Sequence, residues 1–291
     1  MRHKIAGAED LQSVVRSMKA LAASSIGQYE SATVALEAYD RTVSLGLAAC
    51  VRHSTPAISS DRAGPTKRPN VGAVVFGSDQ GLVGNFNEVV ADFFHENCRT
   101  FSGATKRVWA VGQRAQAILL ETSTCTVEFL PVPTSVDRIT PLVRQILIEV
   151  ESARAKGEVW EIYIFHNQPK EGSLYEPVYK RLLPLDDRWQ EKLIAAPWPT
   201  KAVPEIMGGV DSVLADFIRG YLFVSLFQAC AESLASENAS RLAAMQRAEK
   251  NIADMLDNLN GTLHRMRQES IDEELFDVIS GFEALTKNAN A

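Results

Sequence analysis

The stretch from Gly209 to Leu285 decides the fold, and it reads GVDSVLADFIRGYLFVSLFQACAESLASENASRLAAMQRAEKNIADMLDNLNGTLHRMRQESIDEELFDVISGFEAL. Its apolar residues return at alternating steps of three and four, which is the spacing of a coiled-coil seam. They include Val210, Leu214, Phe217, Tyr221, Val224, Phe227, Ala231, Leu234, Leu242, Met245, Ile252, Met255, Leu259, Leu263, Met266, Leu275, Val278, Phe282 and Leu285. No proline follows Pro204, so the pattern predicts one uninterrupted α-helix. At about 1.5 Å per residue it would be on the order of 110 Å long, which exceeds a domain of ordinary size.

The beginning of the chain offers a partner for this helix. Residues 2–52 contain no proline and repeat the helical spacing at Ile5, Leu11, Val14, Val15, Met18, Leu21, Ala22, Ile26, Tyr29, Ala32, Leu36, Tyr39, Val43 and Leu47. Small residues at Ala20, Ala22, Ala23, Ser24 and Ser25 would let a second helix come close. We therefore expect the two terminal helices to pair antiparallel, and any length beyond the pair to be received by another molecule.

The prolines divide the chain into three parts. All twelve lie between Pro56 and Pro204, because proline is excluded from helix interiors. We expect an N-terminal coiled-coil helix at 1–55, a central α/β domain with an N-terminal linker at 56–204, and a C-terminal long coiled-coil helix at 205–291. Residues 53–70 hold three prolines and no periodicity, which is typical of a loop or linker.

The middle of the chain alternates between strand and helix patterns. The continuous apolar run Val71–Gly77 is typical of a strand buried on both faces. Further strands are expected at 107–111, 126–130 and 159–167, and helices at 87–99, 113–121 and 135–156. This alternation predicts a Rossmann-like, mostly parallel sheet with flanking helices, and Tyr175–Leu185 is extended enough to add an edge strand. The expected fold class is therefore α/β plus a long antiparallel α-helical coiled coil.

Composition excludes several classes of protein. The chain has 36 acidic and 30 basic residues, so nothing suggests a nucleic-acid surface. The four cysteines, Cys50, Cys98, Cys125 and Cys230, lack the close spacing of a zinc ribbon or a dithiol redox motif. No signal peptide is recognisable at the N-terminus, and the most apolar run, Tyr221–Ala231, is short of the ~20 residues that span a bilayer. We expect a soluble chain that reaches a membrane only through something else.

Glycines follow the first predicted strand, where a dinucleotide-binding fold would hold a phosphate. Gly77, Gly81 and Gly84 do not form Gly-x-Gly-x-x-Gly, and no Gly-Lys-Ser or Gly-Lys-Thr is present. We interpret them as a tight strand-to-helix turn, in which Asp79 serves the turn or caps a helix. The five histidines are scattered, so the sequence predicts no metal site, no cofactor and no catalytic constellation.

Three stretches together resemble the γ subunit of the rotary F-type ATP synthase. They are Arg16-Ser-Met-Lys-Ala-Leu-Ala-Ala-Ser-Ser25; Ser78-Asp-Gln-Gly-Leu-Val-Gly-Asn-Phe-Asn87; and Glu232-Ser-Leu-Ala-Ser-Glu-Asn-Ala-Ser-Arg241 with Met245, Arg267-Gln-Glu-Ser-Ile-Asp-Glu-Glu274 and Ile279-Ser-Gly281. The resemblance extends from one end of the chain to the other, and the three stretches occur in the same order as in the family. The chain departs from the family's pattern at three positions: it has Gln80 where arginine is usual, Val83 where cysteine is frequent, and Asp272 where threonine is common. These departures indicate a divergent bacterial branch and leave proton or sodium coupling open.

The resemblance implies a central stalk that makes and breaks no bond itself. Its expected partners are the α and β subunits of the catalytic hexamer, the ε subunit and the membrane c-ring, with one copy per complex. It implies a peripheral location on the cytoplasmic face of the bacterial inner membrane. It also implies subunit or helix-to-helix contacts at Met18, Arg241, Arg267, Gln268, Asp272 and Glu274.

Two other interpretations stay open from the residues alone. The first is a nucleotide-binding α/β enzyme, an oxidoreductase or transferase, that uses its helices as a coiled-coil dimerisation arm. The second is a general coiled-coil scaffold, which would self-associate through identical helices. A shaft would instead pair its own head with its own tail, and the isolated chain would bind neither ATP nor NAD.

Overall fold

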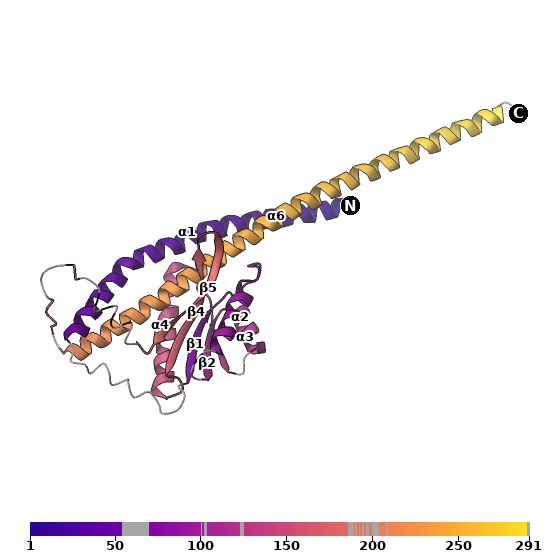
Figure 1. Cartoon of the computed structure of the whole chain (residues 1–291). Helices are drawn as coiled ribbons and strands as arrows, with labels where there is room; N and C mark the ends of the chain where they lie inside the picture. The colour runs from indigo at the N-terminus through magenta and orange to yellow at the C-terminus, as the bar shows by residue number, and fades with distance from the viewer. Residues whose placement is uncertain are drawn as a thin grey trace. The chain divides into compact units, whose positions relative to one another are not determined.

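Long helices begin and end the described chain, with strands and shorter helices between them (Figure 1). The computed structural model describes residues 1–53, 70–99, 101, 104–122, 125–185, 189, 191, 193, 195, 198–199, 204–207 and 209–289, without the side chains of 106, 173 and 280–289. The elements are α1 (Arg2–His53), β1 (Val71–Phe76), α2 (Phe86–Cys98), β2 (Thr105–Val111), α3 (Gln113–Thr122), β3 (Thr126–Leu130), α4 (Val136–Ala155), β4 (Glu161–Lys170), β5 (Ser173–Leu183) and α6 (Val210–Ala289). The predicted linker falls almost wholly on residues 54–69, outside the described residues.

Contacts between residues group the chain into two units. The first unit holds residues 1–21 and 242–291, and the second holds residues 22–241. Both terminal helices contribute to both units. The division of the chain at about residues 55 and 204, expected from its prolines, stays a prediction.

The second unit contains a five-stranded sheet in the order β3-β2-β1-β4-β5. β1 pairs in parallel with β2 and β4, and β2 pairs in parallel with β3. β5 runs antiparallel to β4 at the edge. The predicted, mostly parallel sheet with an added edge strand is therefore confirmed.

Two apolar cores cover the two faces of this sheet, because successive strand residues point to opposite sides. Val74, Trp109 and Ile164 share one core with α4 and with the parts of α1 and α6 in this unit. Val75, Ala110 and Phe165 share the other core with α2 and α3. Strand β1 is buried at every position, as its continuous apolar sequence predicted.

Inside this unit α1 and α6 run side by side in opposite directions. A Cβ added to Gly46 would lie 2.2 Å from the Phe217 ring, and one added to Gly220 would lie 3.4 Å from Val43. Tyr29, earlier in α1, adjoins Glu237 and Arg241, later in α6. The predicted antiparallel pairing is confirmed, and glycine permits its closest approach at Gly46.

Some members of the predicted stripes are exposed. In the first unit, Leu11, Val14 and Leu21 of α1 are exposed, as are Met255 and Met266 of α6. In this unit, residues 1–21 of α1 are much shorter than the segment of α6 that begins at residue 242. A short helix cannot cover a much longer one, so the last part of α6 keeps its apolar residues uncovered.

Helix α4 matches the helix expected at 135–156 and contains Pro141 near its beginning, so proline in this chain is not confined to non-helical segments. Helix α6 differs from expectation in its hydropathy. An 18-residue stretch within Val210–Ile279 has a mean hydropathy of 1.4, enough by length and composition to cross a membrane, and half of it is buried in the structure. Leu222, Leu226 and Ala231 of α6 lie in the core beside the sheet, which accounts for apolar sequence in this helix.

Candidate functional site: the turn after β1 and the surfaces of α6

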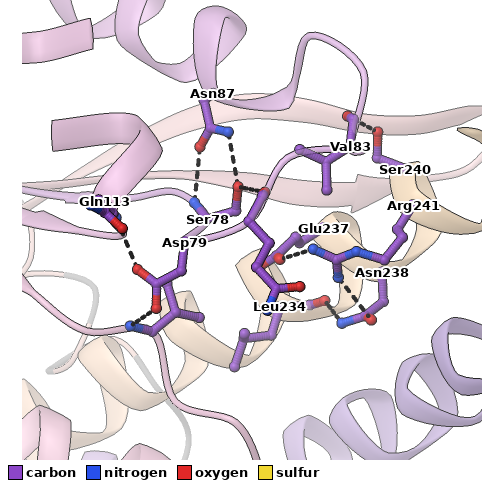
Figure 2. A network of polar contacts seen from close by, with 12 residues as sticks. Ser78, Asp79, Val83, Asn87, Gln113, Leu234, Glu237, Asn238, Ser240 and Arg241 are labelled. Atoms are coloured by element: carbon purple, nitrogen blue, oxygen red, sulfur yellow. Dashed lines mark hydrogen bonds and ion pairs between the residues drawn. The ribbon is translucent and has the colours of Figure 1, made fainter. Parts of the chain in front are cut away.

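The turn between β1 and α2 is held by a short hydrogen-bond network (Figure 2). The buried amide of Asn87 accepts from the backbone N–H of Ser78 at 2.9 Å and donates to the Ser78 hydroxyl at 2.9 Å. That hydroxyl in turn donates to the backbone carbonyl of Gln80. A Cβ at Gly77 would lie 2.4 Å from the Cβ of Ala115, so only glycine fits where the turn meets α3.

Asp79 fastens this turn to two other segments. Its Oδ1 accepts the backbone N–H of Gln113, the first residue of α3, at 2.9 Å, and its Oδ2 accepts that of Val132, after β3, at 3.0 Å. A carboxylate at a helix N-terminus stabilises the unpaired N–H groups there. Asp79 thereby joins the carboxyl ends of three parallel strands.

The turn needs left-handed backbone at two residues, Leu82 (φ 63°) and Gly84 (φ 62°). Gly84 adopts this conformation at little cost, whereas a leucine is strained there. Gly81, which the sequence also assigned to the turn, does not have a positive φ. A Cβ added to it would lie 3.6 Å from Nη2 of Arg114, which is an ordinary van der Waals contact.

The turn is fixed to α6 by Ser240, whose hydroxyl donates to the backbone carbonyl of Val83. Both residues are buried. Nearby, Asn167 of β4 donates to the carbonyl of Phe86 at 2.9 Å. The turn therefore contacts the sheet on one side and α6 on the other.

A buried ion pair lies on α6 beside the turn (Figure 2). Nη2 of Arg241 donates to Oε1 of Glu237 at 2.6 Å, and the two side chains are 14% and 7% exposed. Burial raises the pKa of Glu237, and Asp79 adds to this, while Arg241 opposes it. Arg241, expected from the resemblance to be a contact residue, is thus engaged with its own helix, and an external contact for it stays a prediction.

A second polar link joins α6 to the sheet. Nε2 of His166 in β4 lies 2.8 Å from Oε2 of Glu232, and Gln228 donates to the other oxygen of Glu232 at 2.8 Å. Lys180 of β5 donates to the hydroxyl of Ser225 at 3.2 Å. Sequence reasoning regarded His166 as one scattered histidine and missed this link.

In the first unit, Glu249 of α6 accepts from Arg16 at 3.2 Å and from Lys19 at 2.8 Å on α1. The hydrogen bonds from Lys19 and then Arg16 lower the pKa of Glu249. Met18 lies half-buried between these two basic residues in the sequence. The structure therefore brings α1 and α6 together at the predicted Met18 segment.

Family membership follows from a comparison of the whole sequence. The family model described as ATP synthase matches residues 1–285. This chain belongs to that family. The ATP synthase gamma chain of Rhizobium johnstonii is 26% identical over 297 residues, and that of Nitrosomonas europaea is 27% identical over 300 residues. Each alignment covers 98% of both chains.

Solved structures of ATP synthase share the fold of this family member. A chain of the Euglena gracilis mitochondrial ATP synthase rotor superposes with a TM-score of 0.60 at 16% identity, covering 93% of this chain and 97% of its own length. A chain of the Tetrahymena thermophila mitochondrial ATP synthase central stalk and c-ring has a TM-score of 0.52 at 19% identity, with 81% and 99% covered. These likenesses confirm the fold of paired terminal helices and a central sheet.

The end of α6 in this ATP synthase family member is exposed. Arg267, Gln268, Asp272 and Glu274, the other residues that the resemblance implied, are all exposed. Large apolar side chains accompany them, among them Leu275, Phe276 (73% exposed) and Val278. An exposed apolar helix surface is typical of a contact with another protein, but the roles of these residues stay predictions.

Among the described residues, no group of three or more His, Cys, Asp and Glu side chains is arranged to hold a metal ion. Burial raises the pKa of the Cys98 thiol to about 11, so the thiolate is disfavoured at neutral pH. Sequence reasoning missed Glu237, Ser240, Asn87 and Glu249. Only the Glu237–Arg241 pair had a local signal, because its spacing of four residues brings opposite charges together on a helix.

Proposed function

We propose that this chain is the central rotor shaft of an F-type ATP synthase and transmits torque between a membrane c-ring and a catalytic α/β hexamer. The observation that carries the proposal is the match of one family over residues 1–285, with the two terminal helices paired inside a single chain. ATP synthesis or hydrolysis would thereby be coupled to proton or sodium transport.

A shaft acts by contacting each surrounding subunit differently at each angle. Such contacts shift the open and closed states of a site only by their difference in free energy between those states. The exposed end of α6, with Phe276 and Val278 beside charged residues, offers the kind of surface a ring of subunits would receive. The contacts of His166 with Glu232 and of Lys180 with Ser225, which join α6 to the sheet, would carry force to the α/β domain. We place the ε subunit and the c-ring at that domain.

The chain itself would do no chemistry, and the nucleotide would be held by the hexamer. We infer a peripheral place on the cytoplasmic face of a bacterial inner membrane, because the gamma chains of Rhizobium johnstonii and Nitrosomonas europaea are bacterial relatives over nearly the whole length. One copy would serve each complex.

The alternative of a nucleotide-binding enzyme has less support from the structure. In an open α/β sheet a dinucleotide binds at the carboxyl ends of the strands. Here side chains of α1 and α6 border that position, around a cavity of about 250 Å³. Small-molecule sites are commonly about 300–1,000 Å³, so the space is small for a dinucleotide.

The test is a pull-down of the tagged full chain from native membranes. We expect the ATPase α and β subunits to accompany it in stoichiometric amounts. The same purified chain, titrated with ATP and NAD in equilibrium dialysis, should bind neither. Nucleotide hydrolysis by the purified chain alone would overturn the proposal.

A further inference from the structure

A polar cavity lies where four segments of the second unit meet. Its volume is about 250 Å³, and its lining includes Tyr29 of α1, Asp79 and Gln80 of the turn, Thr134 after β3, and Glu237 and Arg241 of α6. Figure 2 shows Glu237 projecting from α6 on the side that faces the turn. The network described above therefore has an open space beside it.

The buried carboxylate of Glu237 lacks one partner. Its Oε1 accepts from Arg241, but among the described residues its buried Oε2 has no hydrogen-bond donor. The residue is only 5% exposed. Leaving a buried charged acceptor unpaired is costly, and a donor that reached it would stabilise the folded chain.

The charges around the cavity favour a cation. Both oxygens of Asp79 already accept backbone N–H groups, yet its negative charge still acts on Glu237. Arg241 is the one basic residue of the described lining, and it stands against the two carboxylates. An anion would therefore be repelled, and a further positive charge would be attracted.

We propose that this cavity is a binding site for a guanidinium group, which donates to the open oxygen of Glu237. The group comes from an arginine side chain of a partner chain or from a small guanidinium compound. This inference goes beyond the proposed function and is tested on the isolated chain, so either can fail without the other.

A guanidinium fits the lining better than an ammonium ion or a metal does. It is planar, more weakly hydrated than ammonium, and presents several N–H donors in a fixed fork. Leu234, Val132 and Pro133 give the cavity apolar walls, and the lining also includes Tyr29, an aromatic residue of the kind that attracts a guanidinium. A metal would need more ligands than the described residues supply.

The probe is methylguanidinium chloride, titrated into the purified full chain at constant ionic strength while Tm is measured by calorimetry. Saturable binding to the folded state should raise Tm by roughly 2–4 °C. Methylammonium chloride at equal concentration should raise it less. Equal effects of the two cations, or no saturable rise, would overturn the proposal.

Three variants locate the effect. Glu237→Gln should abolish the rise. Gln80→Arg changes an exposed residue of the lining and supplies a guanidinium from within the chain, so it should raise Tm without ligand and remove the response. Gln80→Met, of similar length and uncharged, should keep the response. An unchanged response in both Glu237→Gln and Gln80→Arg would show that the cation acts elsewhere.

The two sources are separated with the tripeptide Gly-Arg-Gly as a second probe. A partner's arginine requires that the tripeptide raise Tm as methylguanidinium does, and that Glu237→Gln remove this rise. A rise with methylguanidinium alone assigns the site to a small compound. Failure of both probes refutes the site.

Discussion

Asp79 and Glu237 are two carboxylates beside the same turn, and their surroundings give them different tasks. Asp79 has a backbone donor for each oxygen, so its charge holds three segments together. Within the part of the chain that the structure describes, Glu237 has a donor for one oxygen only, and it is more buried than Asp79. Local sequence indicated a turn or cap role for Asp79, because aspartate after a strand and beside glycines is common in turns. For Glu237 the sequence offered a local signal only for its pairing with Arg241, four residues on, because its other neighbours come from distant parts of the chain.

We predict that Gly77→Ala strongly destabilises the chain. The new Cβ would lie 2.4 Å from the Cβ of Ala115 and 2.7 Å from Oδ1 of Asn87, so the turn or α3 must shift. A loss of about 3 kcal/mol in the free energy of unfolding is expected. The measurement is urea unfolding followed by circular dichroism.

The matched control is Gly27→Ala in α1, where an added Cβ meets nothing within 4 Å. An exposed helical glycine costs about 1 kcal/mol relative to alanine, so this variant should gain stability. Two variants that change stability in the same direction would contradict the packing assigned to Gly77.

Glu237 should make stability depend on pH. Burial raises its folded pKa above the ordinary value, so the folded chain binds the proton more tightly than the unfolded chain does. Its contribution is therefore fully present below the unfolded pKa and is lost as pH rises through the raised folded pKa. Glu237→Gln should lack this loss.

The measurement is the free energy of unfolding of both proteins at a series of pH values from the ordinary glutamate pKa upward. Tyr29, Asp79, Cys230 and Arg241 act on or beside Glu237 and are present in both proteins, so the difference isolates Glu237. A constant difference across that range would show that its pKa is not raised.

At the scale of elements, the strands and short helices follow from local pattern, while their attachments do not. β1 and β3 lie at or within one residue of their predicted positions, because continuous apolar runs and alternating units are local signals. β4 begins two residues later and ends three residues beyond expectation, since its extension depends on pairing with β5. The bond from Ser240 to Val83 joins residues far apart in sequence, so no local pattern predicts it.

Ser240→Ala should loosen the attachment of the turn to α6. The carbonyl of Val83 would lose a buried donor, at a cost of about 1–3 kcal/mol in the free energy of unfolding. Ser17→Ala is the control, because the exposed Ser17 hydroxyl donates to the Ser13 carbonyl of its own helix. Equal losses in the two variants would argue against a special role for Ser240.

At the scale of the whole molecule, the paired terminal helices and the sheet could be predicted because both leave long periodic patterns in the sequence. The exposed end of α6 was also expected, since a helix that long exceeds its partner. The residues of α6 that contact another subunit at this end depend on the surfaces of the other chains, which this sequence does not contain. The contact residues therefore came only from the resemblance.

Arg267→Ala or Gln268→Ala should lower coupling in the assembled complex with little loss of assembly. Both side chains are exposed, so their removal should leave the fold intact and delete the contacts that we propose with the surrounding ring. Pumping per ATP hydrolysed, measured in inverted membrane vesicles, should fall several-fold. Glu269→Ala is the neighbouring control, and full coupling in the double variant would count against the assignment.

Met18→Lys should impair coupling as well. Met18 is half-buried, so lysine would bring a charge into the contact that we propose between the shaft and the surrounding ring. The charge would also lie between Arg16 and Lys19 in sequence, which already share Glu249. Ser17→Lys places the same charge at an exposed neighbouring position, and normal ion pumping by Met18→Lys would refute the prediction.

Polar contacts attach the α/β domain to α6 at three points: Lys180 to Ser225, His166 to Glu232, and Val83 to Ser240. Along α6, Ser225, Glu232 and Ser240 follow one another at spacings of seven and eight residues, which is roughly two helical turns each. A domain attached to a helix at one point could rotate about that point, whereas several attachments along the helix axis prevent this rotation. The sheet and this part of α6 would therefore rotate as a rigid body, and a torque applied to the sheet would be transmitted directly to the helix.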